Sequence, residues 1–212
     1  MRNNDFIKRF LSSTILIPIV LFFILKGSFL FIFFLLICFF ITVYEWHMIS
    51  KKKTYNFLGY FFLIFSFFTI YKLRINEADS YWTLLFITTI CISTDIGGYI
   101  FGKTFKGPKL IKISPNKTYT GMVGSYLLSI ITILFFSIYI PADVYFENWP
   151  IHVFLISTIS QLGDILISYC KRLSNVKDTG KIIPGHGGLL DRVDGMIFAF
   201  PFYYLMILMD IF

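Results

Sequence analysis

The sequence predicts an all-α, polytopic membrane protein whose helices cross the bilayer about seven times. Of its 212 residues, 57% are hydrophobic and 27 are Phe, whereas soluble domains are about 45–50% apolar. The apolar residues also form long runs, such as STILIPIVLFFIL and SFLFIFFLLICFFITVY. Runs of about 20 apolar residues are typical of membrane-spanning helices. Several such runs exclude a lone signal peptide and disfavour a soluble helical domain.

The apolar runs also predict where the spans lie. No repeat or Ser/Gly-rich linker divides the chain, so we expect a single membrane domain over residues 1–212. Residues 1–90 would supply N-terminal transmembrane helices, and residues 91–212 would carry the catalytic transmembrane region. The expected spans are approximately 10–25, 28–45, 56–72, 81–101, 119–140, 151–171 and 194–210.

The basic residues predict the orientation of these spans. With seven spans, every Lys and Arg except Lys26, Lys72 and Arg74 falls on one side of the membrane. The positive-inside rule assigns that side to the cytoplasm, together with the N-terminus. The two longest loops, 102–118 and 172–193, lie on the same side, so we expect function at the cytoplasmic face. The positive-inside rule therefore explains the net charge of +7, and we expect no nucleic-acid partner.

Acidic residues occur where a membrane helix tolerates them poorly. A carboxylate at the centre of a membrane helix costs about 3 kcal/mol on insertion scales, and such residues usually face the bundle interior and mark a functional site. An ion-coupled transporter is one function class that they allow. The acids within or at the ends of apolar segments are Glu45, Asp95, Asp164, Asp191 and Asp194.

The segment QLGDILISYCKR, residues 161–172, places three polar side chains on one helix face. Ser168 lies four residues after Asp164, and Lys171 lies seven residues after it, which are helical spacings. The polar face ends at Lys171 and Arg172, where the helix would reach water. A polar contact between neighbouring helices is the structural alternative.

A polar, Gly-rich segment, KDTGKIIPGHGGLLDRVDG at 177–195, precedes the last span. Asp191 and Asp194 are neighbours if the last helix begins here, and either could instead cap that helix. Glycine lets backbone N–H groups approach an anion closely, so Gly187 and Gly188 are candidates for holding phosphate, although a simple turn would use the same residues. The basic residues and the histidine of this segment are Lys177, Lys181, His186 and Arg192.

The other long loop is bordered by TDIGGYIFGK at 94–103 and SPNKTYTG at 114–121. Asp95 lies near the cytoplasmic end of its span, and Gly97 and Gly98 allow a neighbouring helix to pack closely.

The second of these motifs predicts a helix start. Ser114 or Asn116 is the expected N-cap, and Lys117 would lie beside the helix N-terminus, where phosphate binds readily. A cap with a lysine that only sets membrane orientation is the alternative.

The mixture of charges suggests the chemistry. Carboxylates repel phosphate unless a divalent cation lies between them, and aspartate oxygens suit Mg²⁺, which also bridges to substrate phosphates. Metal with Lys and Arg is what phosphoryl and nucleotidyl transfer require, because catalysis there is mostly positioning and charge neutralisation. His186 is a candidate for donating a hydrogen bond to phosphate or for acting as an acid–base group. A purely structural histidine is the alternative.

Taken in order, these motifs resemble the phosphatidate cytidylyltransferases (CDP-diacylglycerol synthases). The resemblance covers about residues 94–195. The matching residues are Thr94 to Lys103, Ser114 to Gly121, Gln161 to Asp164, Ser168, Lys171, Arg172, Lys177, Asp178, Gly180, Pro184, His186, Gly187, Gly188 and Asp191 to Asp194.

The resemblance implies that the protein converts CTP and phosphatidic acid to CDP-diacylglycerol and pyrophosphate. It also implies a homodimer in a bacterial inner membrane and a metal centre of Mg²⁺, with K⁺ admitted beside it, held by Asp164 and Asp191. The other expected catalytic residues are Ser168, Lys171 and His186. The expected substrate-binding residues are Asp95, Lys103, Ser114, Lys117, Arg172, Lys177, Asp178, Gly187, Gly188, Arg192 and Asp194. A different lipid phosphate as acceptor stays open.

Overall fold

The computed structural model describes residues 16–51, 53–75, 80–111, 114, 117–141, 148–183 and 187–209. A short apolar helix, Leu16–Lys26, comes first. The helices that follow are α2 (Ser28–Ser50), α3 (Asn56–Ile75), α4 (Ser80–Phe105), α5 (Tyr119–Phe136), α6 (Trp149–Leu173), α7 (Leu190–Val193) and α8 (Met196–Leu208).

The helices confirm the predicted class of an all-α, polytopic membrane protein. Helices α2 to α6 are each long and apolar enough to cross a membrane. The predicted first and last spans coincide with two shorter apolar helices, Leu16–Lys26 and α8. The predicted count of seven crossings and the cytoplasmic N-terminus stay predictions, and the start of the first predicted span lies outside the described residues.

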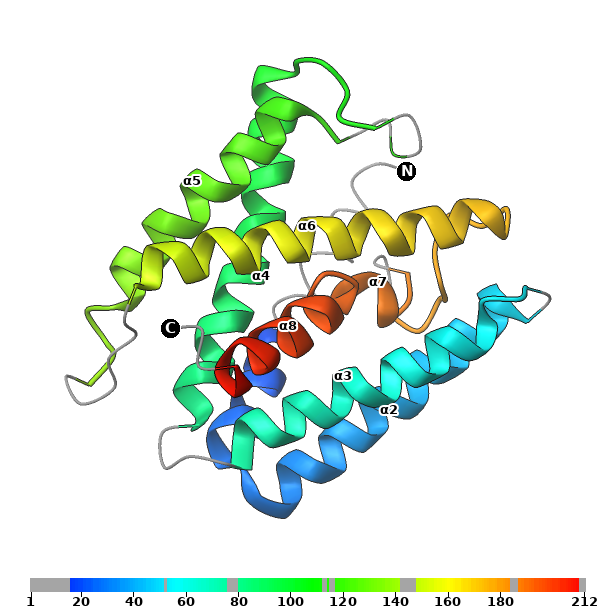
Figure 1. Cartoon of the computed structure of the whole chain (residues 1–212), viewed down its shortest axis with the longest axis horizontal. Coiled ribbons are helices and arrows are strands. Elements are labelled where there is room, and N and C mark those ends of the chain that lie inside the picture. The colour runs from blue at the N-terminus through cyan, green and yellow to red at the C-terminus, as the bar shows by residue number, and fades with distance from the viewer. Residues whose placement is uncertain are drawn as a thin grey trace.

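The helices pack as two pairs joined by α6 and α8 (Figure 1). Helices α2 and α3 lie side by side, and α4 packs along α5. The long helix α6 crosses α4 and α5, and α8 lies between α6 and α3. This arrangement brings α6 and the start of α8, which come from the C-terminal part of the chain, next to the α4–α5 pair.

Glycines bring α4 and α5 unusually close, as the sequence predicts for Gly97 and Gly98. A Cβ atom on Gly97 would lie 2.5 Å from the carbonyl oxygen of Gly124, and a Cβ atom on Gly121 would lie 2.8 Å from that of Gly98. Small residues permit such backbone contact in membrane helices. The close approach places Asp95 of α4 near the N-terminal end of α5.

Hydroxyl groups join α4, α5 and α6 in the interior. Thr94 Oγ1 donates to Ser157 Oγ at 2.8 Å and lies 2.9 Å from Ser129 Oγ. Ser125 Oγ donates to the carbonyl oxygen of Thr94 at 2.7 Å. Such bonds between membrane helices satisfy polar groups that lipid cannot solvate, and they set the relative positions of the three helices behind the site.

The start of α5 differs from the prediction. Thr118 is its N-cap, with the side-chain oxygen accepting from Gly121 N at 3.1 Å, so the prediction of Ser114 as cap is wrong, and Asn116 lies outside the described residues. The physical reason is that Lys117 is bound into an extended loop, where its carbonyl oxygen accepts from Leu110 N at 2.8 Å. Thr118 has the extended backbone typical of an N-cap.

Candidate active site

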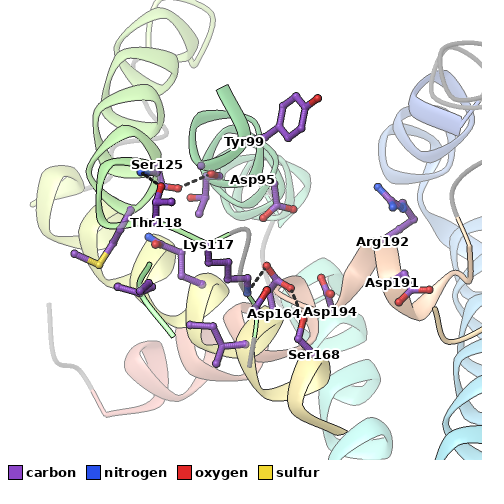
Figure 2. Close-up of a pocket in the computed structure, with 18 residues that line it drawn as sticks. Asp95, Tyr99, Lys117, Thr118, Ser125, Asp164, Ser168, Asp191, Arg192 and Asp194 are labelled. Atoms are coloured by element: carbon purple, nitrogen blue, oxygen red, sulfur yellow. Dashed lines mark hydrogen bonds and ion pairs between the residues drawn. The ribbon is translucent and has the colours of Figure 1, made fainter. Parts of the chain in front are cut away.

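A cavity of about 340 Å³ lies where α4, α5, α6 and the α7–α8 turn meet (Figure 2). It contains polar side chains from motifs that are far apart in the sequence. The predicted site residues that line it are Asp95, Ser114, Lys117, Asp164, Ser168, Asp191, Arg192 and Asp194. The fold therefore brings residues of the polar segments at 94–121, 161–172 and 177–195 together around one space.

Asp164 of α6 is bound from two directions. Its Oδ2 atom lies 2.6 Å from Lys117 Nζ, and its Oδ1 atom accepts from Ser168 Oγ at 3.3 Å. The side chains of Lys117 and Asp164 keep 22% and 31% of their surface exposed, and both line the cavity, although the Lys117 Nζ atom itself is buried. The predicted proximity of Asp164 and Ser168 on one helix face is confirmed, and Lys117 from the other loop neutralises the Asp164 carboxylate. Lys171, the third residue of that predicted face, is bound to Asp191 and does not line the cavity.

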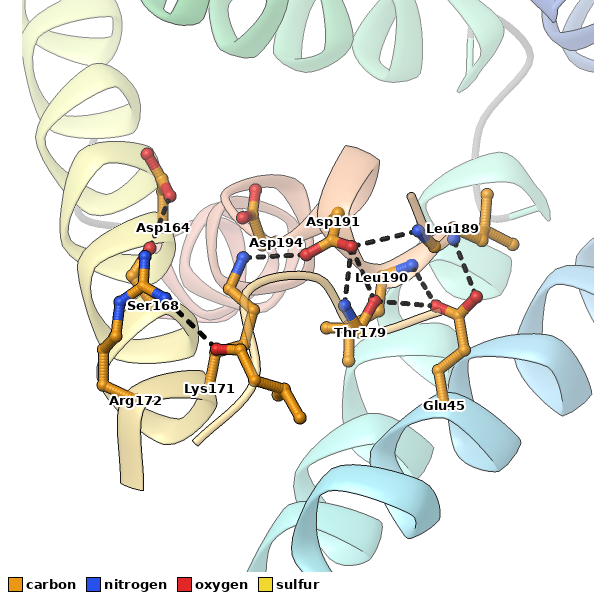
Figure 3. A network of polar contacts seen from close by, with 12 residues as sticks. Glu45, Asp164, Ser168, Lys171, Arg172, Thr179, Leu189, Leu190, Asp191 and Asp194 are labelled. Atoms are coloured by element: carbon orange, nitrogen blue, oxygen red, sulfur yellow. Dashed lines mark hydrogen bonds and ion pairs between the residues drawn. The ribbon is translucent and has the colours of Figure 1, made fainter. Parts of the chain in front are cut away.

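Asp191, in the first turn of α7, is more enclosed (Figure 3). Its Oδ1 atom lies 2.7 Å from Lys171 Nζ, and the two side chains are 6% and 11% exposed. Its Oδ2 atom accepts from Thr179 N at 2.7 Å, Thr179 Oγ1 at 3.0 Å and Gly188 N at 3.0 Å. Burial alone would raise the pKa of Asp191, but the hydrogen bonds from Lys171, Gly188 and Thr179 hold that pKa below its ordinary value. Asp191 is therefore an ionised carboxylate.

Two further acids, Asp95 and Asp194, line the same cavity. Asp95 comes from α4, and Asp194 lies in the turn between α7 and α8, where it is 7% exposed. Figure 2 shows both around the space that Asp164 also borders. Asp194 Oδ1 accepts from the adjacent Gly195 N at 2.9 Å. The cavity thus collects four carboxylates from three helical elements, and this density of negative charge favours a cation within it.

The Gly-rich loop packs around the carboxylate of Asp191 and binds it. Gly187 has a φ of +89°, and a Cβ atom there would lie 2.8 Å from Asp191 Oδ2, so only glycine fits without strain. The sequence predicts that the N–H groups of this loop approach a phosphate. In the structure the anion that the Gly188 N–H binds is Asp191.

Comparison with known proteins accounts for this combination of membrane helices and charged motifs. The model of the cytidylyltransferase family matches residues 7–91 and 54–210. The chain belongs to the cytidylyltransferase family. It is therefore a nucleotidyltransferase.

Individual members of the cytidylyltransferase family show the same relationship, and each of the following is named phosphatidate cytidylyltransferase. The protein of Brucella suis is 33% identical over 208 residues, which are 96% of this chain and 75% of the relative. That of Rickettsia typhi is 39% identical over 169 residues, or 76% of this chain and 73% of the relative. That of Rickettsia felis is 35% identical over 208 residues, or 93% and 90%.

Some of the predicted substrate-binding residues of this cytidylyltransferase do not line the cavity. The Lys103 ammonium lies over the ring of Tyr99, 5.4 Å from its centroid, and Arg172 Nη1 donates to the carbonyl oxygen of Val176 at 3.2 Å. Lys177 and Asp178 are exposed on the loop after α6. The roles of these four residues stay predictions.

His186 lies outside the described residues, so its predicted catalytic role stays a prediction. Of the described residues on either side of it, Ile183 N donates to the carbonyl oxygen of Gly187 at 2.9 Å.

The acidic side chains of the site are of the type that a hard divalent cation prefers. Among the described residues, no three His, Cys, Asp or Glu side chains form a group that could hold a metal, but Asp164 and Asp191 border one cavity and both offer carboxylate oxygens. Mg²⁺ suits such an incomplete set, because it keeps several waters and binds through one or two carboxylates plus substrate phosphates.

Sequence reasoning missed two residues that shape the site. Thr179 donates to Asp191 from both its N–H and its hydroxyl, and its position between Asp178 and Gly180 carried no distinct signal. Glu45 was conspicuous as an acid in an apolar run, but its role could not be assigned. In the structure it is buried against the loop that holds Asp191 (Figure 3).

Proposed function

We propose that this chain is a phosphatidate cytidylyltransferase, which joins CTP to phosphatidic acid and releases pyrophosphate. The observation that carries the proposal is that two motif aspartates, each paired with a lysine, line one cavity: Asp164 pairs with Lys117, and Asp191 pairs with Lys171. In a family that acts on CTP, this arrangement offers positive charge for phosphates and carboxylates for a metal.

In the proposed reaction, a phosphate oxygen of phosphatidic acid attacks the α-phosphorus of CTP. A new phosphorus–oxygen bond forms there, and the bond from the α-phosphorus to the bridging oxygen breaks, so that pyrophosphate leaves. Both substrates are anions, so the site must reduce their mutual repulsion. Lys117 and Arg192 both line the cavity and are suited to contact substrate phosphates.

We propose that Asp164 and Asp191 hold Mg²⁺ and that the same site has room for K⁺ as a second ion. When bound, the metal would neutralise charge on the phosphate oxygens and orient them for attack. Asp164 has the more accessible carboxylate of the two, while Asp191 is held in one orientation by its four hydrogen bonds. Ser168 stays close enough to Asp164 to orient its second oxygen.

The same proposal places the site at the cytoplasmic side of a bacterial inner membrane, in a homodimer. The basic loops support the cytoplasmic side through the positive-inside rule, and the bacterial relatives support the membrane. Labelling of single cysteines introduced into loop 102–118 by an impermeant reagent tests the side, and crosslinking in native membranes tests the dimer.

The function is tested with purified protein in detergent or nanodiscs, supplied with Mg²⁺, labelled CTP and phosphatidic acid. We expect CDP-diacylglycerol and pyrophosphate in equal amounts, and at least about 100-fold less of both from Asp164→Asn and Asp191→Asn. Glu147→Gln, an acid outside the motifs, is the matched control and should retain activity. Absence of product from the wild type, or full activity in both asparagine variants, would refute the proposal.

A second experiment, in which lipid acceptors compete, tests the identity of the acceptor. Unlabelled phosphatidic acid should compete with any other lipid phosphate offered, such as a polyprenyl or ether-lipid phosphate. A preference for one of these other acceptors would assign a different substrate to the same site. Cation flux in liposomes without CTP would instead favour the transporter alternative.

A further inference from the structure

Glu45 is a buried carboxylate on a helix that carries none of the motifs. It lies on α2 and is 1% exposed. Its Oε1 atom accepts from Leu189 N at 3.0 Å, and its Oε2 atom accepts from Leu190 N at 2.7 Å. A buried carboxylate is costly unless it is hydrogen-bonded, so these contacts explain how the helix tolerates it.

The contacts of Glu45 complete a helix end that has no cap of its own. Leu189 is the N-cap residue of α7 and makes no side-chain capping bond. The first N–H groups of a helix need acceptors, and Glu45 supplies them from a residue 144 positions away in the chain. The start of α7 therefore depends on α2 for its position.

Thr179 connects Glu45 to Asp191. Its hydroxyl lies 3.1 Å from Glu45 Oε2 and 3.0 Å from Asp191 Oδ2, while its N–H donates to Asp191 Oδ2 at 2.7 Å (Figure 3). A hydroxyl has one proton, so the two carboxylates share it. Displacing Glu45 would therefore alter the orientation of Asp191 through Thr179.

The surrounding loop has no room for a different arrangement. A Cβ atom on Gly180 would lie 2.5 Å from Glu45 Oε1, and a Cβ atom on Gly188 would overlap both Thr179 Oγ1 and Glu45 Oε2. Gln at position 45 would keep the length of the side chain but turn an NH₂ group toward backbone N–H donors. Glutamine is thus a close match in shape that removes one acceptor.

We propose that Glu45 is a positioning residue, which holds Asp191 in its working orientation through Thr179 and the backbone of residues 188–190. This inference rests on the proposed function. Glu45 does not line the cavity, so it acts on the reaction through Asp191 and makes no contact with substrate.

The first test measures the loop without any catalysis. In Glu45→Gln, hydrogen–deuterium exchange of peptides covering residues 187–195 should be about tenfold faster than in the wild type, because a buried hydrogen bond to the start of α7 is lost. Exchange in α5 should stay the same. Unchanged exchange at 187–195 in a folded Glu45→Gln protein would overturn the inference.

The second test separates kcat from KM. Changes to groups that orient a metal-binding or catalytic side chain typically cost 10–100-fold, so we expect Glu45→Gln and Thr179→Val to lower kcat by about this factor. The KM for CTP should change by less than about threefold. The double variant should lose little more than either single one, because both act along one chain of contacts, whereas Thr179→Ser keeps the hydroxyl and should keep activity.

Ser66→Ala is the matched control for a general loss of stability. Ser66 is also fully buried, and its Oγ atom donates to the carbonyl oxygen of Ile197 on α8 at 2.8 Å, a bond that involves neither Thr179 nor the main-chain N–H groups that Glu45 binds. It should lower the thermal midpoint while kcat stays within about twofold. An equal loss of kcat in Ser66→Ala at the same thermal shift would show that Glu45 is only structural. If the wild type makes no CDP-diacylglycerol, the proposed function fails, but the exchange test still decides the role of Glu45.

Discussion

Lys171 Nζ lies 2.7 Å from Asp191 Oδ1, with both side chains almost withdrawn from solvent. The two residues come from α6 and α7, at opposite ends of the loop that carries the Gly-rich motif. The ion pair therefore closes this loop and fixes one carboxylate at the cavity. Because an unpaired buried charge is far costlier than a paired one, the pair also ties the stability of the loop to the chemistry of the site.

We expect Lys171→Met to destabilise the protein by about 3–5 kcal/mol, because it leaves Asp191 charged and unpaired. Thermal unfolding in a fixed detergent measures this effect. Adding Asp191→Asn to the variant should restore part of the lost stability, since the uncompensated charge is removed. Lys26→Met, an exposed lysine elsewhere, is the control, and a Lys171→Met protein as stable as this control would contradict the prediction.

Substitution of Lys117 should behave differently, because its pair with Asp164 is more exposed. A partly exposed ion pair contributes less than a buried one, and fully exposed pairs contribute only about 0–1 kcal/mol, so Lys117→Gln should lower the thermal midpoint less than Lys171→Met does. The loss of a cation from the cavity should raise KM for CTP or phosphatidic acid about tenfold. Steady-state kinetics with each substrate varied in turn measure this, with Lys53→Gln as control. Unchanged KM values for both substrates would remove Lys117 from the binding site.

Removal of divalent metal should abolish activity. We expect chelation to stop product formation and added Mg²⁺ to restore it, because the carboxylates of the cavity, the triphosphate of CTP and the phosphate of phosphatidic acid repel one another unless a cation lies between them. Asp164→Asn should require about tenfold more Mg²⁺ for half-maximal activity where activity is still measurable. Full activity after exhaustive chelation would exclude the proposed metal centre.

The contact between α4 and α5 should tolerate no added side chain. In Gly97→Ala the new methyl group would lie 2.5 Å from the carbonyl oxygen of Gly124, so the helices must separate, at a cost of about 1–3 kcal/mol. Thermal unfolding midpoints compare this variant with Ile96→Ala, which removes an exposed side chain from the same helix. If the two variants unfold at the same temperature, the close contact contributes nothing to stability.

The helices themselves were predictable, but their ends were less so. The predicted span 81–101 corresponds to α4, which runs on to Phe105. Hydropathy loses the signal at Gly102 and Lys103, whereas the backbone continues its helical hydrogen bonds into the polar surface layer. The N-cap of α5 was misplaced for a related reason, since the hydrogen bond from Leu110 N to the carbonyl oxygen of Lys117 holds Lys117 outside the helix.

Within the site, local spacing predicted what lies on one helix. Asp164 and Ser168 are four residues apart, and their hydrogen bond follows from helix geometry. Glu45 could be recognised only as an acid in an unusual place, because its partners Leu189 and Leu190 are distant in the chain and donate through main-chain N–H groups. Main-chain donors carry no sequence signal.

By itself, the sequence determined that this protein is a bundle of membrane helices with a charged, Gly-rich site in its C-terminal half. Apolar length and helical spacing are local properties, and they are readable without a fold. Only the tertiary structure decided which lysine neutralises which aspartate, and that α2 holds the start of α7. Lys171 and Asp191 are 20 residues apart, and Glu45 and Leu190 are 145 apart. Such pairs are created by helix packing, which brings a buried charge to a partner that is either an opposite charge or a main-chain N–H, because lipid cannot solvate it.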